Sequence, residues 1–337
     1  AWELSERAVM LSESASGDLS GVEYDRARLG LLRVRGYVTY NRGMWEQSES
    51  ILASLHAVAT TLGERKIAAE AALDRGITLK RIGREEAGLM LIGDIVKAAR
   101  ARGDRRTVIE GLRRQALFAW EHGDLDTCER LARQGLLSSG GEDMEDSRAG
   151  LLVVLTAIQC EHGQLVAATS GLTEAEGIFR RLRNKRSHCV VLCNLAEILL
   201  WQGEMGESLR RASEALELAT DVDFHVGMSA ALRIMAMTQM DLGAIDAAGN
   251  SLTRALSFAE ESVDVDIVAT RFLCGRLALR MGDPEGSKRH LEAGLKASTA
   301  GDPESYGPLL SAMYARACVV FGEDESGRAG LEAAEAA

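Results

Sequence analysis

Histidine is the first residue type in this chain that could do chemistry. His122 and His162 each stand between a glutamate and a glycine, and they lie 40 residues apart. General acid–base catalysis needs such a side chain within hydrogen-bond reach of a reacting group, and neither string supplies a partner. The spacing indicates a repeated structural position instead, in which a histidine in the last turn of a helix interacts with its C-terminal end.

A second candidate is the string HCVVLC, which contains His188, Cys189 and Cys193. Residues four apart share one face of a helix, and thiolates and imidazoles are zinc ligands. A fourth ligand is not evident, and buried cysteine is a common small core residue. The sequence therefore predicts no metal and no cofactor. Nucleophilic catalysis by the other cysteines is not expected either, because no histidine is placed to activate Cys160, Cys274 or Cys318.

Other motifs of chemistry are weak in this sequence. The acidic strings GEDMED (141–146) and GEDES (322–326) lack the alternating spacing of a calcium loop. There is no phosphate-binding GxxxxGK[ST] string, no kinase signature and no helix-turn-helix reader with a basic face. Without a convergent nucleophile and base, we predict that the chain is not an enzyme.

Composition favours a helical protein. Only three of the 337 residues are proline, and 4% are aromatic, so we expect helices packed through aliphatic and small side chains. The net charge of −11 argues against nucleic acid or an anionic membrane as partner. No CxxC pair, secretory signal or long uncharged apolar stretch is present, so we expect a cytoplasmic protein without a membrane span.

An internal repeat orders the whole chain. Glycines recur in steps of 40, 40, 40, 40, 40, 39 and 40 residues, and we call this series the glycine comb: Gly43, Gly83, Gly123, Gly163, Gly203, Gly243, Gly282 and Gly322. Each comb glycine ends one helical pattern and precedes another. Glycine just past a helix end adopts positive φ without a Cβ clash, so each repeat is expected to be helix A, a tight turn and helix B.

Small residues flank every comb glycine. Five positions after it stand only Ser, Gly, Cys or Ala, and seven positions before it only Gly, Ala or Thr. Helices that cross closely need small residues at the crossing, so these two columns predict where helix A meets helix B. Ser208 and Ala196 are the pair in the fifth repeat.

The same register predicts the domain organisation. We expect one solenoid over residues 1–337, with a partial leading repeat at 1–20 and full repeats near 25–64, 65–104, 105–144, 145–184, 185–224, 225–264, 265–303 and 304–337. Solenoids need polar caps at their ends, and neither end carries one. The chain is therefore expected to be a fragment of a larger protein.

These columns resemble the tetratricopeptide (TPR) repeat family. The fifth repeat matches most fully, with Asn194-Leu195-Ala196, Trp201-Gln202-Gly203, Ser208, Ala212 and Ala215-Leu216. TPR units usually have about 34 residues. The longer unit is similar to bacterial variants in the regulatory domains of MalT-like activators and of related signal-transduction ATPases and kinases. HEAT repeats, of roughly 40–47 residues, rank second because they do not usually carry this comb.

The resemblance implies an all-α, right-handed solenoid of about eight helix-turn-helix hairpins, a TPR-like superhelix whose A helices line a concave groove. It implies binding of a protein or peptide segment, from a partner or from another domain of the parent chain, in a bacterial signalling protein. The alternative is a small-molecule effector in a sensor domain. Carried over position by position, the groove residues are Arg33, Tyr37, Tyr40, Arg113, Trp120, Glu197, Trp201, Arg233 and Arg276.

Three of these arginines, Arg33, Arg113 and Arg233, share one column, ten residues before the comb glycine. Guanidinium groups match carboxylates and phosphates, so one hypothesis is a groove for an acidic peptide or an anionic ligand. The other is a structural ion-pair network with the acidic neighbours. These acidic neighbours are Glu70, Glu110 and Glu197. The sequence leaves both hypotheses open.

Overall fold

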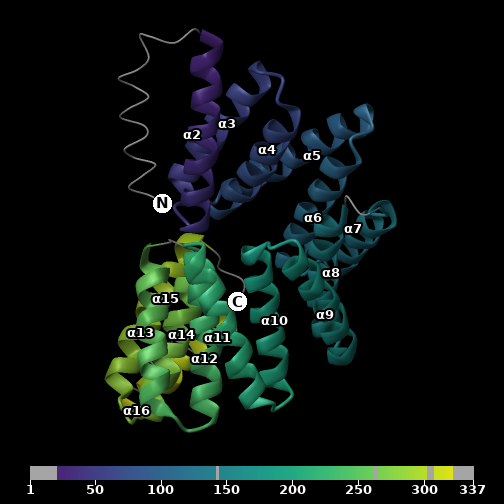
Figure 1. The fold of residues 1–337 in the computed structure, drawn as a ribbon. Helices are drawn as coiled ribbons and strands as arrows, with labels where there is room; N and C mark the ends of the chain where they lie inside the picture. The colour runs from purple at the N-terminus through teal and green to yellow at the C-terminus, as the bar shows by residue number, and fades with distance from the viewer. Residues whose placement is uncertain (1–20, 142–143, 262–264, 302–306, 322–337) are drawn as a thin grey trace. The chain divides into compact units, whose positions relative to one another are not determined.

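The computed structural model describes residues 21–141, 144–261, 265–301 and 307–321 (Figure 1), and these residues form α-helices and turns without a strand. The A helices are α2 (Gly21–Asn41), α4 (Arg65–Arg81), α6 (Arg105–Glu121), α8 (Glu145–Glu161), α10 (Lys185–Trp201), α12 (His225–Asp241), α14 (Val265–Arg280) and α16 (Gly307–Phe321). The B helices are α3 (Trp45–Thr61), α5 (Glu85–Arg102), α7 (Leu125–Ser138), α9 (Leu165–Arg181), α11 (Met205–Asp221), α13 (Ile245–Glu261) and α15 (Pro284–Gly301).

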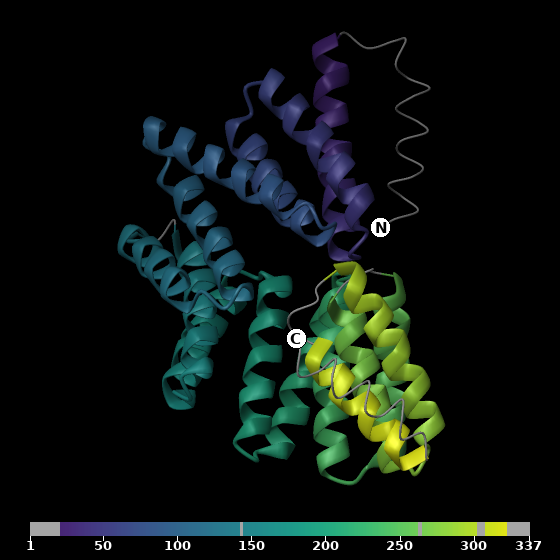
Figure 2. The same cartoon turned by 180° about the vertical axis from the view of Figure 1, so that it is seen from behind.

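From α2 to α9 and from α11 to α16, each helix packs against the next one along the chain, and Figure 2 shows the same helices from behind. The predicted all-α order of helix-turn-helix hairpins is therefore confirmed. The chain divides into two compact units, residues 1–191 (unit 1) and 192–337 (unit 2), with the boundary inside α10. The leading partial repeat, Gly322 and the last B helix lie outside the described residues, and the single solenoid over 1–337 stays a prediction.

The turn from helix A to helix B has one geometry in every described repeat. The seven comb glycines from Gly43 to Gly282 have φ between 67° and 82°. In each turn the comb glycine donates to a carbonyl three residues earlier and the next residue donates to one five residues earlier, as Gly83 does to Lys80 at 2.9 Å and Arg84 to Leu79 at 2.8 Å. This bond pair satisfies the last carbonyls of helix A.

The turn from helix B to helix A is less uniform. Gly63 and Gly103 occupy it with φ of 74° and 72°, whereas Arg183 and Asp223 occupy the matching positions of later repeats with φ of 54° and 56°. A residue with a Cβ atom is strained in this left-handed conformation. Asp223 Oδ1 also lies within hydrogen-bond distance of His225 Nε2, at 3.1 Å. The side chain of Asp223 therefore makes a contact in addition to the strain of its backbone.

The predicted crossing of helix A and helix B is confirmed. Ser208 Oγ donates to the Ala196 carbonyl at 2.8 Å inside the fifth hairpin. In the second hairpin, a Cβ atom on Gly88 would overlap the carbonyl oxygen of Gly76. The crossing positions thus bring the two backbones within contact distance, which only the smallest side chains permit.

We expect Arg183→Gly to stabilise the chain. The substitution removes a left-handed penalty of about 1–2 kcal/mol, of which roughly 0.5–1 kcal/mol is offset by the greater freedom of glycine in the unfolded chain. Urea unfolding of the purified chain measures the change. Asp223→Gly is the comparison and should gain less, because it also loses the contact with His225. A destabilised Arg183→Gly variant would contradict the strain.

We expect Gly88→Ala to destabilise the chain and Gly93→Ala, on the same helix, to leave it unchanged or slightly more stable. The added methyl group at Gly88 meets backbone, which cannot turn aside, whereas nothing lies within 4 Å at Gly93. Overpacking costs about 1–3 kcal/mol, while alanine is favoured over glycine in a helix by about 1 kcal/mol. Thermal unfolding of both variants tests the crossing, and equal effects at the two positions would refute it.

Candidate functional site

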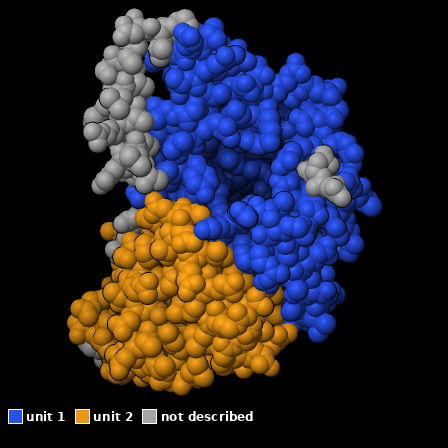
Figure 3. Space-filling view, in the orientation of Figure 1, with its two compact units in different colours: residues 1–191 blue, residues 192–337 orange. Residues whose placement is uncertain are grey.

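Unit 1 is hollowed on the face shown in Figure 3. A cavity of about 290 Å³ lies among its A helices. Charged side chains from α4, α6 and α8 make up most of its lining, and residues near the start of α10 contribute neutral polar groups. The full lining consists of Lys66, Glu70, Leu73, Asp74, Arg106, Thr107, Glu110, Arg113, Arg114, Asp146, Gly150, Phe179, Asn184 and Ser187. We call this cavity and its lining the unit 1 groove.

The repeat register explains why charges meet there. Neighbouring A helices present matching positions side by side, so residues 40 apart can contact each other. Arg114 Nη2 donates to Asp74 Oδ1 at 2.6 Å, and Arg106 donates to Asp146, both across a separation of 40 residues. Opposite charges at one position of successive repeats therefore join α4 to α6 and α6 to α8.

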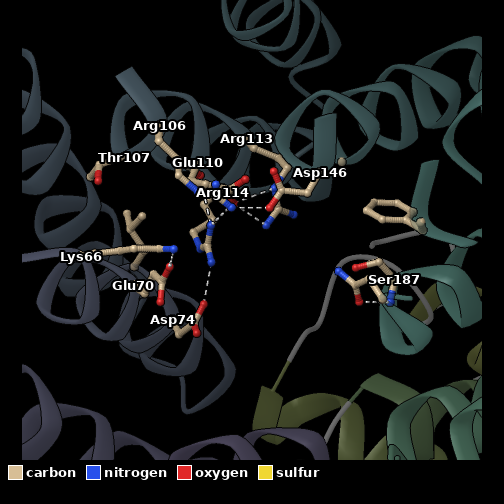
Figure 4. Close-up of a pocket in the computed structure, with 14 residues that line it drawn as sticks. Lys66, Glu70, Asp74, Arg106, Thr107, Glu110, Arg113, Arg114, Asp146 and Ser187 are labelled. Carbon is tan, nitrogen blue, oxygen red and sulfur yellow. Dashed lines mark hydrogen bonds and ion pairs between the residues drawn. The ribbon is translucent and has the colours of Figure 1, made fainter. Parts of the chain in front are cut away.

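Glu110 is the centre of the network (Figure 4). Its Oε2 atom lies 3.0 Å from Arg113 Nη2 and 2.7 Å from Arg114 Nη1. Burial disfavours the ionised carboxyl, but the attraction of Arg113 and Arg114 outweighs it and holds the pKa of Glu110 well below its usual range. Glu110 therefore stays a carboxylate at neutral pH.

Arg114 connects two helices through this carboxylate. Its guanidinium lies between Asp74 on α4 and Glu110 on its own helix, and its side chain is only 11% exposed. Burial disfavours the charged form, yet the two carboxylates raise the pKa of Arg114 above its ordinary value. The cation is permanent, and removing either partner would leave it poorly compensated.

The charges of the lining balance. Four cations face four carboxylates, and each is paired within the lining: Lys66 with Glu70, Arg106 with Asp146, Arg113 with Glu110, and Arg114 with Asp74 and Glu110. The hydroxyl of Thr107 donates to Asp104 at the start of α6, so it serves as part of a helix cap. Such a lining can bind a ligand by exchanging ion pairs and hydrogen bonds.

Among the groove residues predicted in unit 1, only Arg113 lines the cavity. Arg33 is exposed on α2, and Tyr37 is 51% exposed beside it. Tyr40 packs edge-on against Trp45, with ring centroids 5.4 Å apart, and the guanidinium carbon of Arg186 lies 4.6 Å from its ring centroid. Trp120 is 36% exposed at the end of α6, outside the lining of the cavity.

Three of the four groove residues predicted in unit 2 lie in two smaller groups. Burial raises the pKa of Glu197, and the charge of Arg233 partly opposes this shift. The guanidinium carbon of Arg276 lies 6.0 Å from the ring centroid of Phe272. Trp201 is 55% exposed in the last turn of α10. Two of the three column arginines thus lie near a carboxylate, Arg113 near Glu110 and Arg233 near Glu197, whereas Arg33 has no ion pair with the rest of the described chain.

Sequence reasoning missed five of the eight charged residues of the lining, which stand seventeen or nine residues before a comb glycine: Lys66, Asp74, Arg106, Arg114 and Asp146. It also missed Gly150, a glycine in a column that holds glutamate in the two preceding repeats. A usable signal was present, because charges of opposite sign separated by one period predict a contact between neighbouring A helices.

The remaining candidates for chemistry take structural positions. His122 places Nδ1 2.7 Å from the Phe118 carbonyl and Nε2 3.2 Å from Glu85, as expected for a histidine at a helix end. His188 is buried 3.8 Å from Glu176. The described part of the chain holds no group of three metal-ligating side chains and no helix long and apolar enough to cross a membrane.

We expect Glu110→Gln to destabilise unit 1 by on the order of 3 kcal/mol at pH 7, because it leaves two arginines with one carboxylate fewer. The pKa of Glu110 is lower folded than unfolded, so ionised Glu110 stabilises the fold above about pH 4.5 and this contribution is lost as the pH falls toward the folded pKa. The difference in unfolding free energy between the two proteins should therefore narrow below about pH 4.5.

Glu129→Gln is the matched control, because Glu129 pairs with Arg133 within α7 in an exposed position. Exposed pairs of this kind contribute about 0.3–0.5 kcal/mol. Denaturant unfolding at pH 7 and pH 3.5 compares the three proteins. Similar losses for Glu110→Gln and Glu129→Gln would contradict a central role of Glu110.

No protein-family model and no curated protein matches this sequence. Solved structures do resemble it. A Rap protein complexed with competence and sporulation factor has a TM-score of 0.63 at 12% identity, covering 93% of this chain and 98% of that one. The apo form of RapI has a TM-score of 0.51 at 14% identity, covering 92% and 85%.

A third similar structure is BtubC from P. vanneervenii, with a TM-score of 0.51 at 17% identity, covering 64% of this chain and 91% of that one. Likeness at such low identity reports the fold alone. Together with the helix order and the repeated turns, it shows that this chain has a TPR-like repeat fold.

Proposed function

We propose that this chain is a non-catalytic, regulatory protein-interaction domain of a bacterial signalling protein, and that it binds a peptide or protein segment in the unit 1 groove. The observation that carries the proposal is the lining, in which four cations and four carboxylates surround a cavity of about 290 Å³. Interaction scaffolding is the role that a TPR-like fold supports.

The chemistry of the groove suits a peptide. A peptide offers carboxylates, ammonium groups and backbone amides together, so it can exchange pairs with both signs of charge in the lining. Asn184 and Ser187, at the start of α10, add neutral donors and acceptors of the kind that amide groups need. The Rap protein of similar fold was solved with competence and sporulation factor, which supports a partner-binding role here.

The proposal is tested by filling the groove. Gly150 lines the cavity, whereas Gly177 on α9 has nothing within 4 Å and lies outside the lining. We expect Gly150→Leu to abolish binding of peptides selected from a random hexapeptide library on the unaltered chain, and Gly177→Leu to retain it. Fluorescence polarisation with labelled peptides gives the affinities. If neither substitution changed binding, the peptides would bind elsewhere and the groove assignment would be wrong.

Binding of a small charged molecule is the second candidate function, in keeping with a sensor domain. The volume of about 290 Å³ is close to the lower end of ordinary small-molecule sites, roughly 300–1,000 Å³. Such sites are usually mostly apolar, while this lining is charged, which is why the peptide ranks first. Thermal shift of the purified chain against amino acids and organic acids tests this candidate, and no shift with any of them would remove it.

A further inference from the structure

The two adjacent arginines of the unit 1 groove have different surroundings. Both terminal nitrogens of Arg114 are engaged, Nη1 by Glu110 and Nη2 by Asp74. Its side chain is 11% exposed and connects α6 to α4. Arg114 is therefore part of the frame of the groove, and a ligand would have to break two partly buried ion pairs to use it.

Arg113 keeps unused hydrogen-bonding capacity. Its Nε and Nη2 atoms both donate to one oxygen, Glu110 Oε2, at 3.2 and 3.0 Å. The same oxygen also accepts from Arg114 Nη1 at 2.7 Å, so three donors share it. Nη1 of Arg113 has no hydrogen-bond partner among the described residues, and the side chain is 26% exposed toward the groove.

Gly150 makes room for this arrangement. A Cβ atom at position 150 would lie 2.8 Å from Cδ and 3.2 Å from Nε of Arg113. The matching positions of the two preceding repeats hold Glu70 and Glu110, each 40 residues apart. A glutamate at 150 would place a second carboxylate beside Arg113, whereas glycine leaves the guanidinium lying against α8 with its outer edge open to the cavity.

We propose that Arg113 is the anion-binding residue of the groove and that the peptide ligand carries a carboxylate which binds its guanidinium edge. The inference rests on the proposed function of the groove. Nη1 supplies a free donor, and Nη2 can turn part of its bond from the shared Glu110 oxygen to the ligand, which gives the parallel two-bond geometry that carboxylates favour.

The lining holds as many carboxylates as cations, so it offers an incoming anion no large excess of positive charge beyond the open edge of Arg113. One guanidinium edge matches the single charge and two oxygens of a carboxylate. A phosphate monoester carries about −1.5 to −2 at neutral pH, which one open guanidinium edge does not balance. The carboxylate can belong to an Asp or Glu side chain or to the C-terminus of the peptide.

The test uses the full chain and random hexapeptide libraries with free and with amidated C-termini. We expect selected binders to be enriched in Asp or Glu in both libraries if a side chain supplies the carboxylate, or to appear only with a free C-terminus if the terminus does. Arg113→Gln should remove this enrichment and weaken the selected peptides by about tenfold or more. Arg133→Gln, which removes an exposed arginine of α7, should leave both unchanged.

A second variant guards against a folding defect. Gly150→Ala retains the guanidinium but displaces it, so it should weaken acidic peptides several-fold while peptides without a carboxylate are unaffected. Selected peptides that bind equally well to Arg113→Gln and show no acidic enrichment would overturn the inference and leave peptide binding in the groove intact. Failure of the unaltered chain to select any peptide would instead overturn the proposed function itself.

Discussion

The close crossing of helix A and helix B is the constraint on which the rest of this structure depends. Where Gly76 and Gly88 meet, the backbones are so close that a single added methyl group would overlap a carbonyl oxygen. The repeats from Gly43 to Gly243 all carry small residues at this crossing and turn at the same glycine position, and they advance by 40 residues each. Equal positions of successive A helices then stand side by side, and this allows charges one period apart, such as Asp74 and Arg114, to pair.

The unit 1 groove is a consequence of that register. Asp74 with Arg114, and Arg106 with Asp146, are pairs separated by one period, and Glu110 binds Arg114 within α6. The carboxylates and guanidinium groups that shape the cavity are thus also the groups that fasten α4, α6 and α8 to one another. The proposed ligand would therefore contact the same side chains that hold unit 1 together.

The fold could be predicted from the sequence because its determinants are local and repeated. Glycine at fixed steps and small residues on either side are visible without any knowledge of distant contacts, as Ser208 and Ala196 illustrate. The site was harder to predict, because the A-helix positions that face the groove were inferred from the resemblance to TPR repeats. Of the two predicted residues on α6, Arg113 lines the cavity and Trp120 lies outside it. Arg114 was missed because its importance comes from Asp74 on another helix.

The pairs that span one period also fix the order of the repeats. The hairpins share one turn geometry, so by shape they could be exchanged or deleted as whole modules. Loss of residues 105–144 would set Asp74 opposite Val154, and the carboxylate would lose its cation. Duplication or recombination within residues 65–161 is therefore restricted by charge matching between neighbours, even though the helical frame would accept it.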